Sequence, residues 1–360
     1  MKILLITDLY PVKENEDNTP KTLYNFVQCW KKAGHEVKII KPNFILNSFV
    51  RKKPFYKSGW YGDVLNINYW LPFCGNIKKK LKKFFGKDFE QDIIIAHMPS
   101  GILFANKFNK PFVAGIHCSD IEVLTNPLYS VYFKPAMEKA LKNSVCISCR
   151  SFVLRDKIIR LYPDFSDKLF VAPSGVAEEN IIENRLGEIN TDNLKVITCA
   201  NYKKRKNIDK LIYAVKDVSG VELTVIGKGY EKYKKIDKRV KFLGRLSNMK
   251  VMEEMRKSDI FILPSINETF GMVYLEAMAS GCITVCSQND GIDGIIKNGE
   301  NGFTVKPEIN EIKTLVKTLK TYDNVRLQKI REESLKTVRL YTETQCSENY
   351  LANIQKFFCK

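Results

Sequence analysis

Two glutamates bracket a glycine at the expected start of a helix, in the segment 263–281. A predicted strand ends at residue 263, Glu268 lies in the loop that follows, and a helix-like run begins near Gly271. Glycine lets a ligand approach the backbone, and the free amides of residues 271–273 would attract an anion, helped by the helix dipole. Glu276 lies one turn further on, where its carboxylate can accept hydrogen bonds from paired ribose hydroxyls, and Glu268 could hold sugar hydroxyls. The pattern predicts a diphosphate site; the alternative is a capped surface helix with two solvated glutamates.

A lysine and a histidine follow two other predicted strands. Lys206 comes after the strand 195–199, in a run of four cations, and its long ammonium arm suits contact with a diphosphate. A run of charges is more often a solvated loop, so the residues alone leave both interpretations open. His117 follows the strand 112–116, although a lone histidine is usually structural, and we interpret His97 as structural.

Both halves of the chain alternate strand-like and helix-like segments. Residues 2–6, 22–33 and 37–40 form a predicted β-α-β unit, whose crossover requires parallel strands. The other predicted strands are 92–96, 112–116, 145–148 and 168–171, then 195–199, 222–226, 241–243, 260–263, 283–286 and 302–305. The sequence therefore predicts an α/β protein with two open, doubly wound layers.

A turn and a polar stretch separate the two halves. Pro173 to Val176 supply turn chemistry, and residues 177–193 hold few core side chains, as an interdomain hinge should. We expect domains at 1–175 and 176–343, with a C-terminal helix at about 344–360 that packs back on the first domain. Ligands bind at the carboxyl ends of parallel strands, so two such sheets facing one another would form a cleft lined by loops.

The composition favours a folded, cytoplasmic protein with anionic partners. The 360 residues carry 58 Lys and Arg against 40 Asp and Glu, and residues 1–173 hold 27 of the cations against 15 acids. No apolar run reaches the roughly 20 residues that span a bilayer, and the first run breaks at Thr7 before it could form a signal peptide. The ten cysteines lie mostly in apolar segments, which fits a reducing cytosol, and the Cys146–Cys149 spacing lacks the second pair that zinc needs. We therefore predict no metal site.

The stretch 51–87 combines basic and aromatic residues. It has ten Lys or Arg against the single acid Asp63. Residues 75–87 could form a helix with Ile77, Leu81, Phe84 and Phe85 on one face and lysines beside it, a pattern typical of a membrane surface. The alternative is an amphipathic helix packed on the first sheet.

The segment 263–281 resembles the EX7E region of retaining GT-B glycosyltransferases of family 4, with Glu268 and Glu276 as its two glutamates. The resemblance runs through nearly the whole chain. It also takes in Ala33–Val37, Ile116–Asp120, Pro173–Val176, Lys206–Ile208, Val225–Gly229 and Asn298–Gly302.

This resemblance implies the GT-B fold, with two Rossmann-like domains facing a cleft, and assigns roles to particular residues. Lys206 would reach the donor phosphates, and His117, in a His-x-x-Asp match that Asp120 completes, would face the donor sugar. The implied catalytic residues are His117, Lys206 and Glu268; the implied donor-binding residues are Asn201, Arg205, Thr269, Phe270, Gly271, Met272, Val273 and Glu276. Many relatives have an arginine where this chain has Ala200, so Arg205 is a possible substitute.

The resemblance also implies an activity. The implied activity is the transfer of a hexosyl or N-acetylhexosaminyl group from a nucleotide-diphosphate sugar, with retention of the anomeric configuration. A UDP-sugar is favoured over a GDP-sugar as the donor, and no cofactor or metal is expected. The acceptor would be a saccharide or lipid-linked saccharide in bacterial surface polysaccharide synthesis, with the protein peripheral on the inner face of the membrane through residues 51–87. Alternatives are a non-catalytic GT-B binding subunit, or an epimerase or synthase; a nucleic-acid-binding protein is disfavoured because no such motif accompanies the charge.

Overall fold

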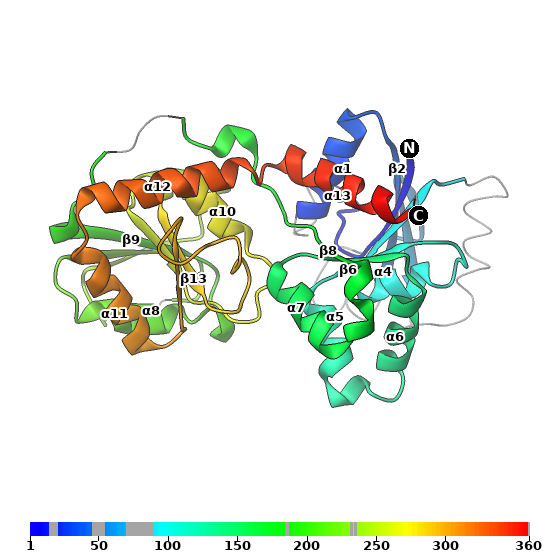
Figure 1. Cartoon of the computed structure of the whole chain (residues 1–360), viewed down its shortest axis with the longest axis horizontal. Helices are drawn as coiled ribbons and strands as arrows, with labels where there is room; N and C mark the ends of the chain where they lie inside the picture. Colours follow the sequence, from blue (N-terminus) through cyan, green and yellow to red (C-terminus); the bar gives the residue numbers. More distant parts are fainter. Residues whose placement is uncertain are drawn as a thin grey trace. The chain divides into compact units, whose positions relative to one another are not determined.

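The computed structural model describes residues 1–13, 21–44, 55–69, 90–183, 187–230, 233 and 236–358, and it divides into two compact units (Figure 1). Unit 1 comprises Met1–Arg150, Leu154–Ala172 and Cys346–Lys360; unit 2 comprises Ser151–Val153 and Pro173–Gln345. The main change of unit, after Ala172, lies close to the boundary expected near residue 175.

Unit 1 is built on an eight-stranded sheet in the order β3-β4-β2-β1-β5-β6-β7-β8. All neighbours are parallel except β3, which pairs antiparallel with β4. The strands are β1 (Lys2–Ile6), β2 (Glu36–Phe44), β3 (Gly59–Tyr61), β4 (Val64–Tyr69), β5 (Ile93–His97), β6 (Val113–Ile116), β7 (Cys146–Cys149) and β8 (Leu169–Val171). The strand order reverses between β1 and β5, which makes the carboxyl ends of these strands a natural place for a site.

The helices of unit 1 bury apolar side chains in its core. The predicted helix 22–33 is present as α1, which buries Leu23, Phe26, Val27 and Trp30 at the helical spacing expected. The others are α4 (Met98–Ala105), α5 (Cys118–Thr125), α6 (Phe133–Asn143), α7 (Phe152–Leu161) and α13 (Glu343–Phe358); α1 spans Thr22–Lys32.

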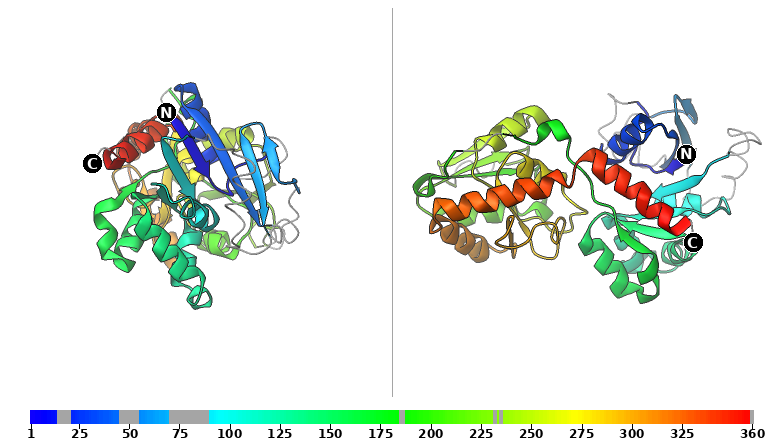
Figure 2. Two further views of the ribbon diagram at one scale, coloured as in Figure 1. Left: turned by 90° about the vertical axis from the view of Figure 1, so that its right-hand side faces the viewer. Right: turned by 45° about the horizontal axis from the view of Figure 1, so that its top comes forward.

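Helix α13 returns the chain to unit 1 (Figure 2). The indole nitrogen of Trp30 in α1 donates to the carbonyl of Ser347 at 3.0 Å. The rings of Trp30 and Tyr350 stack with centroids 5.9 Å apart and planes 8° from parallel. Residues near the C-terminus thus complete the core of a domain that begins at the N-terminus.

Part of the basic stretch 51–87 belongs to the sheet. Residues 59–69 form β3 and β4, and the Val64, Leu65 and Ile67 side chains are buried. Residues 64–68, which fall within the expected interfacial surface, therefore belong to the core of unit 1. The proposed membrane helix at 75–87 lies outside the described residues.

Unit 2 has a fully parallel six-stranded sheet in the order β11-β10-β9-β12-β13-β14. Its strands are β9 (Leu194–Cys199), β10 (Val221–Ile226), β11 (Val240–Gly244), β12 (Ile260–Leu263), β13 (Ile283–Ser287) and β14 (Phe303–Val305). The helices are α8 (Ile208–Lys216), α9 (Asn248–Arg256), α10 (Met272–Ala279), α11 (Ile309–Lys320) and α12 (Asn324–Arg339). Here the strand order reverses between β9 and β12.

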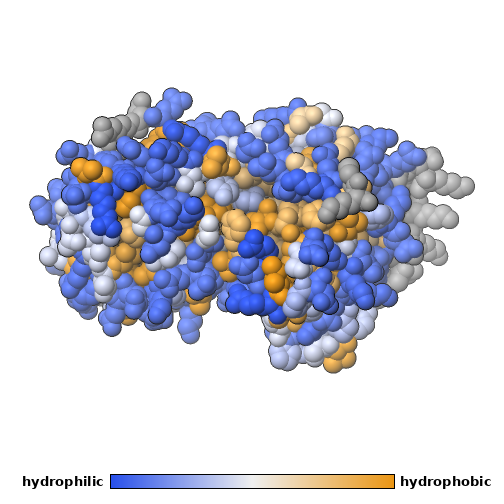
Figure 3. Space-filling view, in the orientation of Figure 1, coloured by the Kyte–Doolittle hydropathy of each residue, from blue (hydrophilic) through white to orange (hydrophobic). Residues whose placement is uncertain are grey.

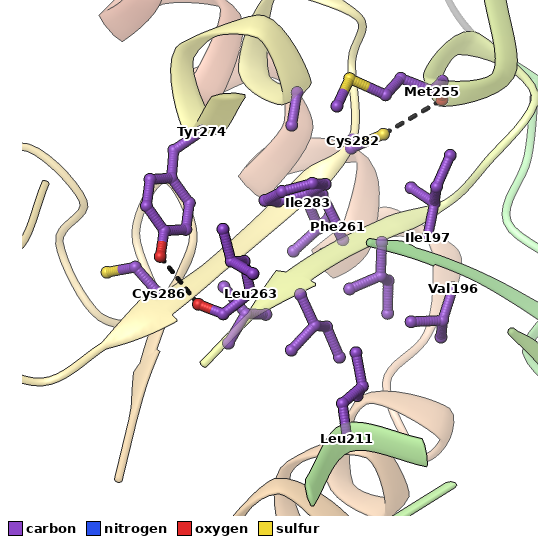
Figure 4. Packing of buried hydrophobic residues seen from close by; sticks show 14 of the residues in the cluster. Val196, Ile197, Leu211, Met255, Phe261, Leu263, Tyr274, Cys282, Ile283 and Cys286 are labelled. Atoms are coloured by element: carbon purple, nitrogen blue, oxygen red, sulfur yellow. Dashed lines mark hydrogen bonds between the residues drawn. The ribbon is translucent and has the colours of Figure 1, made fainter. Parts of the chain in front are cut away.

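The core of unit 2 packs around these two central strands. Figure 4 shows Phe261 and Leu263 of β12 among the side chains of β13, which include Ile283 and Cys286, with Ile197 of β9 on the other side of Phe261. The hydroxyl of Tyr274, on α10, donates to the carbonyl of Leu263 at 2.8 Å. This bond ties the helix to the strand end from which the candidate site begins.

Hydrophilic residues dominate the view of Figure 3, but apolar residues gather over part of unit 1 and again at its lower end. Between α5 and α6, Leu128 and Val131 are 88% and 91% exposed. Within the part of the chain that the structure describes, no helix is long and apolar enough to cross a membrane.

Candidate active site

The loops after β9 and β12 are joined at the point where the strand order of unit 2 reverses. Asn207, in the left-handed conformation with φ 49°, ends the turn Lys204–Lys206 and donates from Nδ2 to the carbonyl of Pro264 at 2.9 Å. The amide of Ile266 donates to the carbonyl of Arg205 at 2.8 Å. These bonds hold the cationic turn against the loop that carries Glu268.

Glu268 forms ion pairs with two cations of that turn. Its Oε2 accepts hydrogen bonds from Lys206 Nζ and, at 3.1 Å, from Arg205 Nη1. The side chains of Lys206 and Glu268 are 15% and 14% exposed, so both are desolvated enough for a strong interaction, whereas Arg205 at 36% is more solvated. The structure therefore brings together three of the predicted site residues. An anion of a ligand would compete with Glu268 for the same cations.

The backbone of Glu268 is held by Asp290, which lies in the loop after β13. Its amide donates to both carboxylate oxygens of Asp290, at 3.1 and 3.0 Å. Gly291 has φ 53°, and a Cβ there would lie 3.0 Å from the carbonyl of Phe270 and 3.3 Å from Glu268 Cβ. Asp290 was not among the predicted residues, although an Asp-Gly pair in the loop after a predicted strand was a signal for it.

Helix α10 begins beside Glu268 as predicted. Gly271 is its N-cap with φ 91°, and a Cβ there would lie 2.5 Å from the Tyr274 ring, so only glycine fits. The first turn of a helix has amides without intrahelical acceptors. The half-buried Met272 and Val273 follow it, whereas Phe270 is buried in the core of unit 2 and Thr269 continues the loop. The start of α10 thus lies in the same loop region as the three charged groups.

Glu276 is held by a residue of another helix. Its Oε1 accepts a hydrogen bond from Asn248 Nδ2, at the start of α9, at 3.0 Å. Burial raises the pKa of Glu276 above its ordinary value, and the bond from Asn248 acts in the opposite direction. Asn248 was missed because no pattern in the sequence connects it with α10.

With Glu276 in the donor-binding role that the resemblance implies, the replacement Asn248→Ala is expected to move the acid limit of donor binding to higher pH. Without the amide bond the pKa of Glu276 rises further, so the carboxylate is neutralised at a higher pH. The donor KM should therefore begin to increase at a higher pH in the variant than in the wild type. A pH series of donor KM checks this. Coinciding profiles would show that Asn248 does not tune Glu276.

Asn201 lies in a different part of the same loop. Its Oδ1 accepts from the amide of Lys228 at 3.1 Å, and the preceding carbonyl of Ala200 accepts from the Tyr230 hydroxyl at 3.0 Å. Gly227 packs so closely that a Cβ there would lie 1.9 Å from that carbonyl. Among the described contacts, Asn201 connects β9 to β10 and makes no bond to Lys206 or Glu268.

His117 belongs to unit 1, at the carboxyl end of β6 and the start of α5. Its amide donates to Asp120 Oδ2 at 2.6 Å, which fixes the His-x-x-Asp turn. Its Nε2 lies 3.0 Å from Nδ1 of His97, the last residue of β5. Burial and the nearby Arg150 guanidinium lower the pKa of His117 to about 3, so the ring is neutral at physiological pH. His97 is fully buried, in agreement with its interpretation as a structural residue.

The predicted site residues therefore fall into two sets. Unit 2 holds Lys206, Arg205, Glu268, Glu276 and the start of α10; unit 1 holds His117. Among the described residues, no group of three or more His, Cys, Asp or Glu side chains could hold a metal ion. Cys146 and Cys149 are free thiols inside the buried strand β7, where burial raises their pKa.

Two family profiles match successive parts of this chain. Residues 20–180 match Glycosyltransferase Family 4, and residues 181–333 match Glycosyl transferases group 1. The first match includes His117, and the second includes Arg205, Lys206, Glu268 and Glu276.

Individual proteins show the same similarity. An uncharacterised glycosyltransferase of Methanocaldococcus jannaschii is 30% identical over 65% of this chain and 65% of its own length. The alpha-monoglucosyldiacylglycerol synthase of Acholeplasma laidlawii is 25% identical over 82% and 83%. The crystal structure of the Anabaena protein HepE in complex with UDP superposes with a TM-score of 0.73 at 15% identity, covering 99% of this chain and 100% of that one. This similarity confirms the predicted GT-B fold class.

Proposed function

The chain belongs to glycosyltransferase family 4, and we propose that it transfers a hexosyl or N-acetylhexosaminyl group from a nucleotide-diphosphate sugar to an acceptor hydroxyl, with retention. The observation that carries this proposal is the convergence of Lys206 and Arg205 on Glu268 beside the start of α10. Unit 2 would bind the donor, and unit 1 would bind the acceptor.

Bond cleavage places negative charge on the departing diphosphate. Groups that are already oriented toward that charge stabilise the transition state without reorganising. In this proposal Lys206 and the amides of residues 271–273 receive the phosphates. Arg205 takes the place of the arginine that many relatives have at the position of Ala200, because its guanidinium meets the same carboxylate as Lys206.

Glu276 would accept hydrogen bonds from the two ribose hydroxyls, while Asn248 holds the opposite side of its carboxylate in place. Glu268 would bind hydroxyls of the transferred sugar once the phosphates compete for its cations. The complex of HepE with UDP supports a donor whose nucleotide is UDP.

His117 would face the transferred sugar from unit 1. Its low pKa means that it would act as a neutral hydrogen-bonding group and not as an acid. The proton of the acceptor hydroxyl would then pass to the leaving phosphate on the same face of the sugar, which is the route to retention.

We propose a saccharide or lipid-linked saccharide acceptor in bacterial surface polysaccharide synthesis, at the inner face of the cell membrane. The name of the A. laidlawii relative, a glucosyldiacylglycerol synthase, supports a lipid acceptor. The ten Lys and Arg of the stretch 51–87, none of which lies in β4, and the exposed Leu128 and Val131 support contact of unit 1 with a membrane surface.

Two measurements together test this function. UDP-sugars and GDP-sugars are screened for protection against thermal unfolding, where a ligand at 100 times its Kd adds about 2.7 kcal/mol of stability. The best donor is then incubated with saccharide and lipid-linked acceptors, and we expect a new glycosidic linkage with the anomeric configuration of the donor. Protection by a donor without any product would instead favour a binding subunit, and an epimerised donor without linkage would favour an epimerase.

Binding to membranes is expected to depend on lipid charge. Each lysine near an anionic surface contributes about 1 kcal/mol, and salt screens the attraction. The protein should sediment with phosphatidylglycerol vesicles and not with phosphatidylcholine vesicles. Replacing Lys78, Lys79, Lys82 and Lys83 by glutamate should weaken this binding at least about 100-fold. Equal binding to both lipids, or none at low salt, would contradict the prediction.

A further inference from the structure

A chain of buried hydrogen bonds connects His117 to the C-terminal helix. His117 Nε2 lies 3.0 Å from His97 Nδ1, and His97 Nε2 lies 3.0 Å from the hydroxyl oxygen of Tyr350. That hydroxyl lies 2.9 Å from Ser148 Oγ on β7. His97, Tyr350 and Ser148 are all buried to within 1% exposure. The four side chains come from two strand ends, a strand and a helix of unit 1.

The hydrogen bonds of this series must all run from donor to acceptor in the same direction. Burial, the His117 ring and Arg150 hold the pKa of His97 well below its usual value, so this ring stays neutral. A neutral imidazole has one N–H and one bare nitrogen, so a donor at one side of His97 requires an acceptor at the other. In the capping box of α5 the His117 side chain accepts from the amide of Asp120, so the other ring nitrogen, Nε2, carries the proton. His117 Nε2 therefore donates to His97, and His97 Nε2 donates to the hydroxyl oxygen of Tyr350.

The surrounding packing holds each link in position. A Cβ on Gly115 of β6 would lie 2.1 Å from His97 Nδ1, so glycine makes the room that this ring occupies. The Tyr350 ring stacks on Trp30 and lies 6.0 Å from the Phe26 ring and 5.8 Å from the Phe170 ring, centroid to centroid. The hydroxyl of Tyr350 therefore cannot leave His97 without moving α13.

We propose that Tyr350 is a positioning residue for His117: by accepting from His97, its hydroxyl holds the bond between His97 and His117 Nε2 and so fixes the rotamer of the His117 ring. This inference rests on the proposed function, in which His117 faces the transferred sugar. A helix more than 200 residues away in the sequence would thus set how the histidine meets its ligand.

The first experiment compares Tyr350→Phe with the wild type. The substitution keeps the stacked ring and removes the hydroxyl alone. We expect kcat to decrease about 10-fold with donor KM unchanged within twofold, since binding depends on unit 2. The control is Tyr162→Phe, which removes another unit 1 hydroxyl, bonded to Glu138 at 2.7 Å, and should leave kcat unchanged.

The second experiment measures the ¹⁵N chemical shifts of the His117 ring and does not require an active enzyme. The chain has three histidines, so ¹⁵N spectra of the imidazoles can be assigned with His35→Gln and His117→Gln variants. We expect the Nδ1 and Nε2 shifts of His117 to change in Tyr350→Phe and to stay constant in Tyr162→Phe. Unchanged His117 shifts would overturn the proposal even if kcat fell.

Product formation tests the proposed function, and the ¹⁵N shifts test the positioning role of Tyr350, so the two hypotheses can fail independently. A wild-type protein that forms no glycosidic linkage would refute the proposed function, while the ¹⁵N shifts would still decide the role of Tyr350. If Tyr350→Phe does not fold, Ser148→Ala shortens the same chain at its far end and leaves every ring in place. We then expect a smaller change of the His117 shifts, and their constancy would overturn the proposal.

Discussion

Replacing Lys206 by alanine is expected to lower kcat about 100- to 1000-fold, the usual cost of removing one group that stabilises developing negative charge. The ammonium lies against Glu268 in a largely buried position, where its interaction with a phosphate is little weakened by solvent. Charge on the phosphate grows as the sugar leaves, so the lost stabilisation is larger in the transition state than in the bound donor. Steady-state kinetics with saturating donor measures the effect.

The matched control is Lys204→Ala, in the same turn of the same loop. Lys204 is exposed, and its replacement removes the same charge without the contact to Glu268. We expect kcat within twofold of the wild type. A Lys206→Ala enzyme with unchanged kcat and only a higher donor KM would mean that this lysine binds the ground state and the transition state equally.

Replacing Glu276 by glutamine is expected to weaken donor binding about 10- to 100-fold while the protein stays folded. A hydrogen bond to a charged group contributes about 1.5–3 kcal/mol, and the amide presents a donor where the carboxylate has only acceptors. Asn248 Nδ2 can still reach the remaining amide oxygen, which then has less capacity for a ribose. Donor titration by calorimetry measures the loss.

The comparison variant is Glu253→Gln, an exposed glutamate on the neighbouring helix α9. It changes the same charge and should bind donor normally. If Glu276→Gln matched this control in affinity and kcat, the assignment of Glu276 to the ribose would be wrong.

The central strands were predictable because buried parallel strands are apolar throughout. Residues 2–6 and 260–263 are such runs, and the structure places them at β1 and β12. The strand β4 was missed because Asn66 and Asn68 interrupt its apolar residues. The Nδ2 groups of both buried side chains donate to the carbonyl of Tyr56, at 3.0 and 2.8 Å, an arrangement that no local pattern reveals.

Of the candidate site, the residues at strand ends were predictable and their supporting partners were not. Lys206, Glu268 and His117 all follow apolar runs in the sequence, and the topology explains why that place matters. Asp290 bonds to Glu268, 22 positions away in the sequence, and Asn248 bonds to Glu276, 28 positions away. Tyr350 bonds to His97, 253 positions away. Such pairs depend on tertiary packing, which spacing along the chain does not encode.

The return of α13 to unit 1 has a consequence for the order of folding. Unit 2 is nearly continuous in the sequence, whereas the core of unit 1 needs contacts between Trp30 and residues 347 and 350, more than 300 residues away. Closing a loop of this length is slow, and a ribosome delivers the last segment only after unit 2 has emerged. Unit 2 should therefore be able to mature during translation, while the aromatic core of unit 1 remains incomplete until synthesis passes residue 350.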